Sequence, residues 1–464
     1  AFVLCNWSIT TILEGKGRLR EIWNYCAYAL VPYILGTALV ILMSNLLTTE
    51  EAAFVTMAQY VVYAWTGISL VQRIVAGLVI GALLGMFVPS EGGIAILGDV
   101  FVGALKAIAP LLVFFLVISS LCYAGASHGG VIRTVIIMYM FSTFLAAIVA
   151  VAASSAFPVT LTLSEAAADM AAPQGVAEVL RTLLMNVVTN PVQSLVSANY
   201  IGILVWAVLI GIALRKASDT TKQSLNDISA ALSKTVTWII QCAPFGIMGL
   251  VYNTVSVNGL STFTEYGKLL AVLLGSMLFI YFVTNPILVF WCIRKNPYPL
   301  IFKCLKKSAI TAFFTRSSAA NIPINMEACA EMGLDKDTYS VTIPLGATIN
   351  MDGAAITITV MTLAAAHTLG IAVDIPSAII LSILATLSAC GASGVAGGSL
   401  LLIPMACSLF GISNDIAMQI VGIGFIIGVI QDSVETALNS SSDLLLSASA
   451  EFRQWRLEGK EIKF

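Results

Sequence analysis

Long apolar runs, each separated from the next by a short polar stretch, fill most of the first 300 residues. A helix needs about 20 consecutive apolar residues to cross a bilayer, and the pattern is helical throughout. The expected spans are 25–46, 53–70, 73–89, 95–122, 132–157, 198–214, 236–256 and 269–292. The pattern therefore predicts an all-α, multi-span membrane protein.

Two later stretches, 305–332 and 376–412, are too long for one span and are interrupted by small polar residues. The second has two apolar halves of about a dozen residues, shorter than a span, with SACGASGVAGGS between them. The first centres on TRSSAANIPIN, where we expect the helix to break at Pro323. Each stretch is predicted to be a re-entrant hairpin.

A long segment with polar residues at its centre follows each hairpin. The first carries Asn350-Met351-Asp352 and the second carries the run 439–443, so we expect a broken helix at both places. Short, interrupted segments in matching positions of two halves are typical of the binding site of a secondary transporter built from inverted repeats.

Lysine and arginine placement gives an expected orientation, because cytoplasmic loops are the basic ones. Loops 215–234 and 293–307 and the tail 451–464 are basic, whereas the connection 158–197 is mostly acidic. Both termini are therefore expected in the cytoplasm. The two hairpins should open from opposite sides of the membrane.

Composition narrows the function. The chain is 58% hydrophobic and 10% charged, against about 25% charged residues in soluble domains. The 40 residues between Asp374 and Asp415 carry no charge, and the net charge of −2 offers no basic surface for nucleic acid. No polar region is long enough for a soluble catalytic domain, so we expect a function within the membrane.

The nine cysteines lie mostly inside apolar runs, form no CxxC pair and are odd in number. They are predicted to be small buried hydrophobic residues rather than a disulfide or zinc framework. His128 and His367 have no partner at ligand spacing, which argues against a histidine-based metal site.

Five charged residues fall in membrane-depth segments, where each costs at least about 2.5 kcal/mol on insertion scales: Arg316, Asp352, Asp432, Glu435 and Asp443. At 100° per residue, Asp432, Thr436, Asn439 and Asp443 form one polar stripe on a helix. Four carboxylates face one arginine, so mobile cations are expected: sodium ions, protons or a substrate ammonium group.

A zwitterionic substrate fits such a site. Its carboxylate would lie at a hairpin tip, where helix N-termini offer N–H groups and Ser318 is a candidate donor, and its ammonium group would meet Asp432.

At TRSSAANIPIN, PLGATINMDG, ACGASGVAGGS and DSVETALNSSSD, the sequence closely resembles the dicarboxylate/amino acid:cation symporters, the glutamate-transporter family. It is most similar to bacterial members that carry serine and threonine with sodium. The resemblance spans about residues 69–450. It implies a homotrimer in the bacterial inner membrane, with eight spans and two opposed hairpins per chain. It also implies an elevator-like movement of a transport part (130–157 and 269–447) against a scaffold (69–122 and 178–256).

The family's site residues are carried over by position. The resemblance implies substrate contacts at Arg316, Ser317, Ser318, Val395, Asp432, Glu435, Thr436 and Asn439. It implies sodium ligands at Gly346, Asn350, Asn439 and Asp443 for one site and at Tyr139, Ser142, Thr143, Asn350 and Asp352 for another. A further sodium site uses Thr348 and the hairpin residues Ala389, Cys390 and Ala392.

Two departures from the family pattern indicate the substrate class. Members that carry acidic substrates have an arginine where this chain has Glu435, and a threonine where it has Ala354. A second carboxylate would repel an acidic substrate. A small neutral amino acid is expected, with Glu435 either accepting a hydrogen bond from its hydroxyl or pairing with Arg316.

Residues 1–68 lie outside the family pattern and contain one or two additional apolar segments, weakly similar to part of a Yip1-type membrane domain. No function is predicted for them.

Three other functions are less consistent with the sequence. The Gly391-Ala392-Ser393-Gly394 run matches the GxSG pattern of rhomboid proteases, but no histidine follows it to activate the serine. An ion channel could also use re-entrant loops. Proton coupling through Asp432 or Glu435 is the closest alternative to sodium coupling.

Overall fold

The computed structural model describes residues 70–88, 93–123, 130–163, 185, 188–390, 392 and 397–462. The chain divides into two compact units, 1–77 and 78–464, and helix α4 (Leu70–Phe87) crosses the division. The predicted extension 1–68, His128 and Val395 lie outside the described residues.

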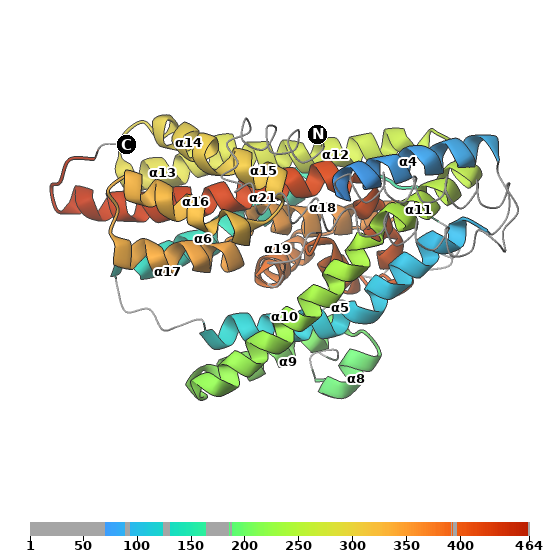
Figure 1. Cartoon of the computed structure of the whole chain (residues 1–464), viewed down its shortest axis with the longest axis horizontal. Helices are drawn as coiled ribbons and strands as arrows, with labels where there is room; N and C mark the ends of the chain where they lie inside the picture. The colour runs from blue at the N-terminus through green and yellow to red at the C-terminus, as the bar shows by residue number, and fades with distance from the viewer. Residues whose placement is uncertain are drawn as a thin grey trace, which may run out of the picture. The chain divides into compact units, whose positions relative to one another are not determined.

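The described part of the second unit is helical throughout and contains no strand (Figure 1). Its first helices are α5 (Ala95–Tyr123), α6 (Gly130–Ala156), α8 (Pro191–Val196), α9 (Tyr200–Ala213), α10 (Asp219–Gln241), α11 (Ala243–Asn258), α12 (Thr262–Phe279) and α13 (Asn285–Ile293). They are followed by α14 (Tyr298–Cys304), α15 (Ile310–Thr315), α16 (Ser318–Glu331), α17 (Lys336–Ile349), α18 (Asp352–Thr368), α19 (Ile375–Ala389), α20 (Ile403–Ser408) and α21 (Asn414–Leu457).

Six described helical segments are long and apolar enough to cross a bilayer, and the bent pair α10–α11 would be a seventh. The predicted span 198–214 is the shorter apolar helix α9, which has 14 residues. The predicted all-α membrane architecture is confirmed.

The prediction of a loop at 215–234 is wrong. Helix α10 begins at Asp219, with Ser218 as its N-cap, and meets α11 at an angle of 54°. Only a few positions of α10 are buried, so its polar residues lie on the outward face of an amphipathic helix. The bend falls at Cys242. Pro244 lies in the first turn of α11, where the missing backbone N–H of proline costs little.

The first predicted hairpin is present, formed by α14, a π-helical turn at Leu305–Ala309, α15 and the returning helix α16. The expected break at Pro323 is wrong, because Pro323 lies inside α16. The chain reverses at Arg316, whose left-handed conformation (φ 51°) ends α15, and Ser317 then caps α16. A non-glycine residue in this conformation is unusual and is concentrated at functional sites.

The first predicted broken helix is confirmed. Helix α17 ends at Ile349, Asn350 and Met351 have non-helical backbone, and α18 begins at Asp352. Pro344 and Gly346 weaken the end of α17. The carboxylate of Asp352 therefore lies in the first turn of α18, where the helix dipole favours an anion.

The second hairpin consists of α19 and of α20 with a preceding 3₁₀ turn at Leu400–Leu402, which matches the two predicted halves. The second predicted broken helix is wrong, because α21 continues for 44 residues through the run 439–443. Within α21, no glycine or proline occurs after Gly428, and the three serines of the run are hydrogen-bonded. Ser441 donates to the Ala437 carbonyl (2.5 Å), while Ser440 and Ser442 accept from asparagines of neighbouring helices.

Helix α21 is the centre of the bundle. It packs against α6, α12 and α13, against both helices of the broken pair and against both hairpins (Figure 1). All residues from Leu438 to Phe452 are buried, including every polar one. Along the chain, the broken pair α17–α18 follows the first hairpin and α21 follows the second.

Candidate substrate and cation site

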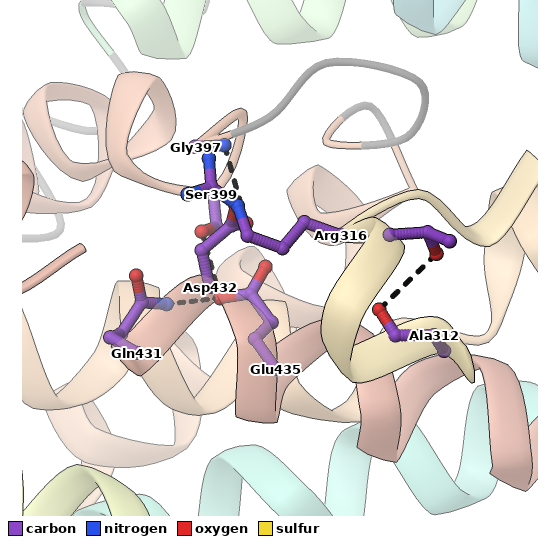
Figure 2. Close-up of polar contacts among 8 residues, drawn as sticks. Ala312, Arg316, Gly397, Ser399, Gln431, Asp432 and Glu435 are labelled. Atoms are coloured by element: carbon purple, nitrogen blue, oxygen red, sulfur yellow. Dashed lines mark hydrogen bonds and ion pairs between the residues drawn. The ribbon is translucent and has the colours of Figure 1, made fainter. Parts of the chain in front are cut away.

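The tips of both hairpins meet at Asp432, near the middle of α21. Arg316 at the first tip forms an ion pair with Asp432, with 2.9 Å between Nε and Oδ2. The backbone N–H of Gly397 in the second hairpin donates to Oδ1 of the same carboxylate (3.3 Å). Figure 2 shows both groups converging on Asp432 from different elements. Because neither side chain is more than 12% exposed, loss of one partner would leave a largely uncompensated charge.

Glu435, one turn along α21, does not pair with Arg316. Its Oε2 accepts hydrogen bonds from the Thr357 hydroxyl (2.7 Å), the Ser399 hydroxyl (2.9 Å) and the Gln431 amide (2.5 Å). Gln431 also donates to Thr357 (2.7 Å), which joins these donors into one network. The other oxygen, Oε1, accepts no hydrogen bond from the described residues and lies on the side of Arg316, away from Gln431 (Figure 2).

A second buried carboxylate, Asp443, lies beside the break between α17 and α18. The Asn350 amide donates to Asp443 Oδ1 (2.9 Å), and the Tyr139 hydroxyl donates to the Asp443 carbonyl (2.9 Å). Gly346 packs so closely here that an added Cβ would lie 2.8 Å from both Asp443 Oδ1 and the Tyr139 hydroxyl. Only glycine leaves this space open.

Asp352 occupies a separate fully buried position. Ser142 donates to its Oδ2 (2.8 Å) and Thr143 donates to its Oδ1 (3.1 Å). Thr143 also accepts from the Met351 N–H (3.2 Å), which fixes the broken segment against α6. Tyr139, which was predicted to share this cluster, contacts Asp443 instead.

Oxygen atoms without a donor identify where a cation fits. Asp443 Oδ2 and Asn350 Oδ1 are buried and have no hydrogen-bond partner. Within the described residues, neither Asp352 nor Asp443 forms an ion pair with lysine or arginine. Buried anions require cations, and hard oxygen ligands suit sodium. These residues therefore fit the predicted cation. The cation would itself be a substrate, carried together with the organic substrate.

The remaining predicted residues lie at the end of α17, at the second hairpin and on α21. Thr348 donates to its own helix at the Leu345 carbonyl (2.7 Å), and Cys390 at the second hairpin tip contacts the Ile349 carbonyl (3.8 Å). The structure thus brings Cys390 of the second hairpin against the end of α17. Thr436 and Asn439 are buried on the same face of α21 as Asp432.

Asn439 has a structural contact that sequence reasoning did not predict. Its Oδ1 accepts from the Gly353 N–H (2.7 Å) at the start of α18. Ser317 caps α16 by accepting from the Ala320 N–H (3.2 Å), and Ser318 is the first residue of that helix, at the hairpin tip.

Sequence reasoning also missed a buried polar cluster between the first hairpin and α21. Asn321 donates to the hydroxyls of Ser440 (2.8 Å) and Ser308 (2.9 Å), and Asn325 donates to the Ser440 carbonyl (2.9 Å). The four-residue spacing of the two asparagines on α16 was the available signal. These bonds attach the returning arm of the first hairpin to α21.

The model of the sodium:dicarboxylate symporter family matches residues 70–451 of this chain. The chain belongs to this family. The prediction of a transporter rather than an enzyme is thereby confirmed.

Curated relatives of this symporter are named serine/threonine transporter SstT. The protein of Bifidobacterium adolescentis is 56% identical over 399 residues, which cover 86% of this chain and 93% of that protein. The protein of Streptococcus thermophilus is 57% identical over 394 residues, covering 85% and 98%. That of Streptococcus agalactiae is 57% identical over 389 residues, covering 84% and 97%. The symporter therefore spans nearly the full length of these relatives.

Proposed function

We propose that this chain imports small neutral amino acids, serine and threonine, driven by sodium influx. The observation that carries the proposal is that one buried site contains two groups of carboxylates with different surroundings. Asp352 and Asp443 lack a described basic partner, whereas Asp432 and Glu435 lie where both hairpin tips meet. The first environment suits a carried cation and the second suits a polar organic substrate.

Sodium is the proposed coupling ion because the available ligands are oxygen atoms, and hydrogen bonds from hydroxyl and amide groups hold them in place. One ion would bind at Gly346, Asn350, Asn439 and Asp443. A second would bind at Ser142, Thr143, Asn350 and Asp352, with Tyr139 bordering both positions. A third position involves Thr348 and the second hairpin from Ala389 to Ala392. Family membership and the relatives' names support this assignment.

Glu435 supports a neutral rather than an acidic substrate. It is buried beside Asp432, so a substrate side-chain carboxylate would add a further negative charge at low dielectric. Oε2 is held by three donors, which leaves Oε1 to accept a hydrogen bond from a serine or threonine hydroxyl.

The Arg316–Asp432 pair suggests how the amino acid binds. The substrate ammonium group would approach Asp432, and the released guanidinium group would remain near the substrate carboxylate, together with the donors at Ser317 and Ser318. Val395 of the second hairpin is the remaining proposed contact. Substrate entry would separate Gly397 from Asp432, so the second hairpin would have to move.

The proposed mechanism is alternating access by an elevator-like movement in a homotrimer. Residues 69–122 and 178–256 would form the scaffold, and 130–157 with 269–447 the moving part. The chain would lie in the bacterial inner membrane, surrounded by lipid, with its N-terminus and the tail 451–464 in the cytoplasm.

The test is uptake of labelled serine into proteoliposomes that contain the purified protein. One set has an inward sodium gradient and a parallel set has a proton gradient without sodium. Excess unlabelled aspartate or threonine is added as competitor. The proposal expects uptake with sodium that threonine inhibits and aspartate does not.

Uptake driven only by protons would contradict sodium coupling and would favour the proton-coupled alternative. Inhibition by aspartate equal to that by threonine would contradict the role given to Glu435. Currents that do not require an amino acid would favour a channel.

A further inference from the structure

A large apolar groove lies between α6 and α12, away from the site described above. Its volume is about 960 Å³, and all but two of its lining residues are apolar. Small side chains create it: Ala152 and Ala156 on α6 face Ala271 and Gly275 on α12. Because residues four apart share a helix face, each helix presents a small-residue stripe to the other.

The groove is open at Gly275. A Cβ atom added to this glycine would meet no atom within 4 Å. The neighbouring side chains therefore do not fill the space between the two helices. From Lys268 to Phe279 the groove follows α12 for roughly 16 Å, at 1.5 Å per residue.

Among the described residues, the only charged one that lines the groove is Lys268, at the end nearest the start of α12. Its side chain is exposed and forms no ion pair with any described residue. The nearby carboxylate of Glu265 accepts from the Thr162 N–H (2.9 Å) and from its hydroxyl. Lys268 is thus available to an external anion.

The position of Lys268 specifies the kind of ligand. Both α6 and α12 have an end near it, so the lysine lies toward a membrane surface and the rest of the groove extends into the hydrocarbon layer. Lysine side chains on spanning helices extend toward lipid headgroups. An acyl chain would fill the apolar part and a phosphate would reach the ammonium group.

We propose that this groove binds one anionic glycerophospholipid, with an acyl chain between α6 and α12 and the headgroup phosphate on Lys268. The inference does not depend on which amino acid the protein carries.

The test compares phosphatidylglycerol with phosphatidylethanolamine on the full-length purified chain. Native mass spectrometry counts retained lipid, and thermal unfolding in detergent measures stabilisation by each added lipid. We expect one retained phosphatidylglycerol and a larger rise in melting temperature with phosphatidylglycerol. The variant Gly275→Leu should fill the groove, and Lys268→Gln should remove the headgroup contact. Both should abolish the preference for phosphatidylglycerol.

Two matched variants serve as controls. Gly267→Leu changes another glycine of α12 that has open space around it but does not line the groove, and Lys234→Gln removes an exposed lysine of α10. Both should keep the preference for phosphatidylglycerol. Lys268→Gln removes only an exposed charge and should fold normally. It therefore tests the proposal even if Gly275→Leu does not fold.

Unchanged phosphatidylglycerol retention in both groove variants would overturn the proposal. Equal binding of the two lipids by the unmodified chain would overturn the anionic preference. A change of oligomeric mass in Gly275→Leu without loss of lipid would assign the groove to a second copy of the chain instead.

Discussion

The two oxygens of the Glu435 carboxylate have different surroundings. Oε2 receives three hydrogen bonds from α18, the second hairpin and α21 itself, whereas Oε1 receives none from the described residues. This difference fixes the orientation of the side chain. A substrate hydroxyl would therefore meet an acceptor that is already held in position, which lowers the entropic cost of binding.

Thr357→Val tests this arrangement, because valine keeps the shape of threonine but removes the donor to Glu435. Hydrogen bonds to charged groups contribute about 1.5–3 kcal/mol, so we expect the preference for serine over alanine to fall about tenfold or more. The KM for serine should rise, and the maximal rate of uptake should change little. Competition of alanine against labelled serine uptake measures it.

Thr357→Ser and Thr359→Val are the controls for that experiment. The first keeps a hydroxyl and should keep the serine preference. The second removes a buried hydroxyl of the same helix that has no hydrogen-bond partner among the described residues. If Thr357→Val and Thr357→Ser had the same substrate preference, Thr357 would be a packing residue rather than a positioning residue for Glu435.

Gly346→Ala tests the cation position near Asp443. The added methyl group would lie 2.8 Å from Asp443 Oδ1 and from the Tyr139 hydroxyl, so one of them must move. We expect the sodium concentration for half-maximal uptake to rise about tenfold, equivalent to about 1.4 kcal/mol. Gly267→Ala, at an open position of α12, should leave it unchanged. A change in serine KM at saturating sodium, without a change in sodium dependence, would contradict the assignment.

The charged members of the site could be predicted from sequence, but their partners could not. Asp352, Asp432, Glu435 and Asp443 are recognisable because carboxylates are costly in a membrane. Thr357 and Ser399 are neutral residues in apolar segments, and nothing local distinguishes them from residues that pack between helices. Their contact with Glu435 depends on how α18 and the second hairpin fold against α21.

At the scale of the helices, Asp374 controls the start of α19. Its carboxylate accepts from the Ser377 N–H (2.8 Å) and caps the helix. Hydrogen bonds from Ser377 hold the pKa of Asp374 below its usual value. Its contribution to stability is therefore present at neutral pH and is lost as the pH falls below about 4, where the cap becomes protonated.

Thermal unfolding of Asp374 variants measures that contribution. We expect Asp374→Ala to lower the melting temperature at pH 7 and to have less effect at a pH below the lowered native pKa of Asp374, where the native side chain is protonated. Asp374→Asn keeps a capping oxygen, so it should unfold near the unmodified protein at pH 7. Equal loss of stability in Asp374→Ala at both pH values would show that the cap does not depend on the charge.

The helix boundaries show which local sequence features end a helix and which do not. Polar residues alone did not break α21, because each serine of the run 440–442 finds a hydrogen-bond partner and no glycine or proline interrupts the helix. The break before Asp352 follows Pro344 and Gly346. Pro323 did not break α16, since the chain had already reversed at Arg316. Backbone preference outweighed polarity at 439–443, and the tertiary arrangement decided the first hairpin.

At the scale of the whole transport core, Lys106 on α5 pairs with Asp415 at the start of α21. The proposed scaffold contains the first residue and the proposed moving part contains the second. The pair borders a cavity of about 620 Å³ lined by α5, α11, α12 and α21. An elevator-like movement would have to separate these two residues.

The double variant Lys106→Cys with Asp415→Cys tests whether they separate during transport. Cross-linking the two thiols should stop serine uptake while sodium-dependent serine binding remains, and a reducing agent should restore uptake. Each single variant, treated with the same reagent, controls for the native cysteines. Full uptake by the cross-linked protein would contradict movement of α21 relative to α5.

The continuity of α21 has an optical consequence. At 1.5 Å per residue its 44 residues extend about 66 Å, roughly twice the hydrocarbon thickness of a bilayer. Asp432, Asn439 and Asp443 thus share one uninterrupted rod with Trp455, whose indole packs on Phe452 with ring centroids 5.2 Å apart. A shift of the rod at the site would displace this indole against its surroundings, so the fluorescence of Trp455 should report ligand binding from a distance.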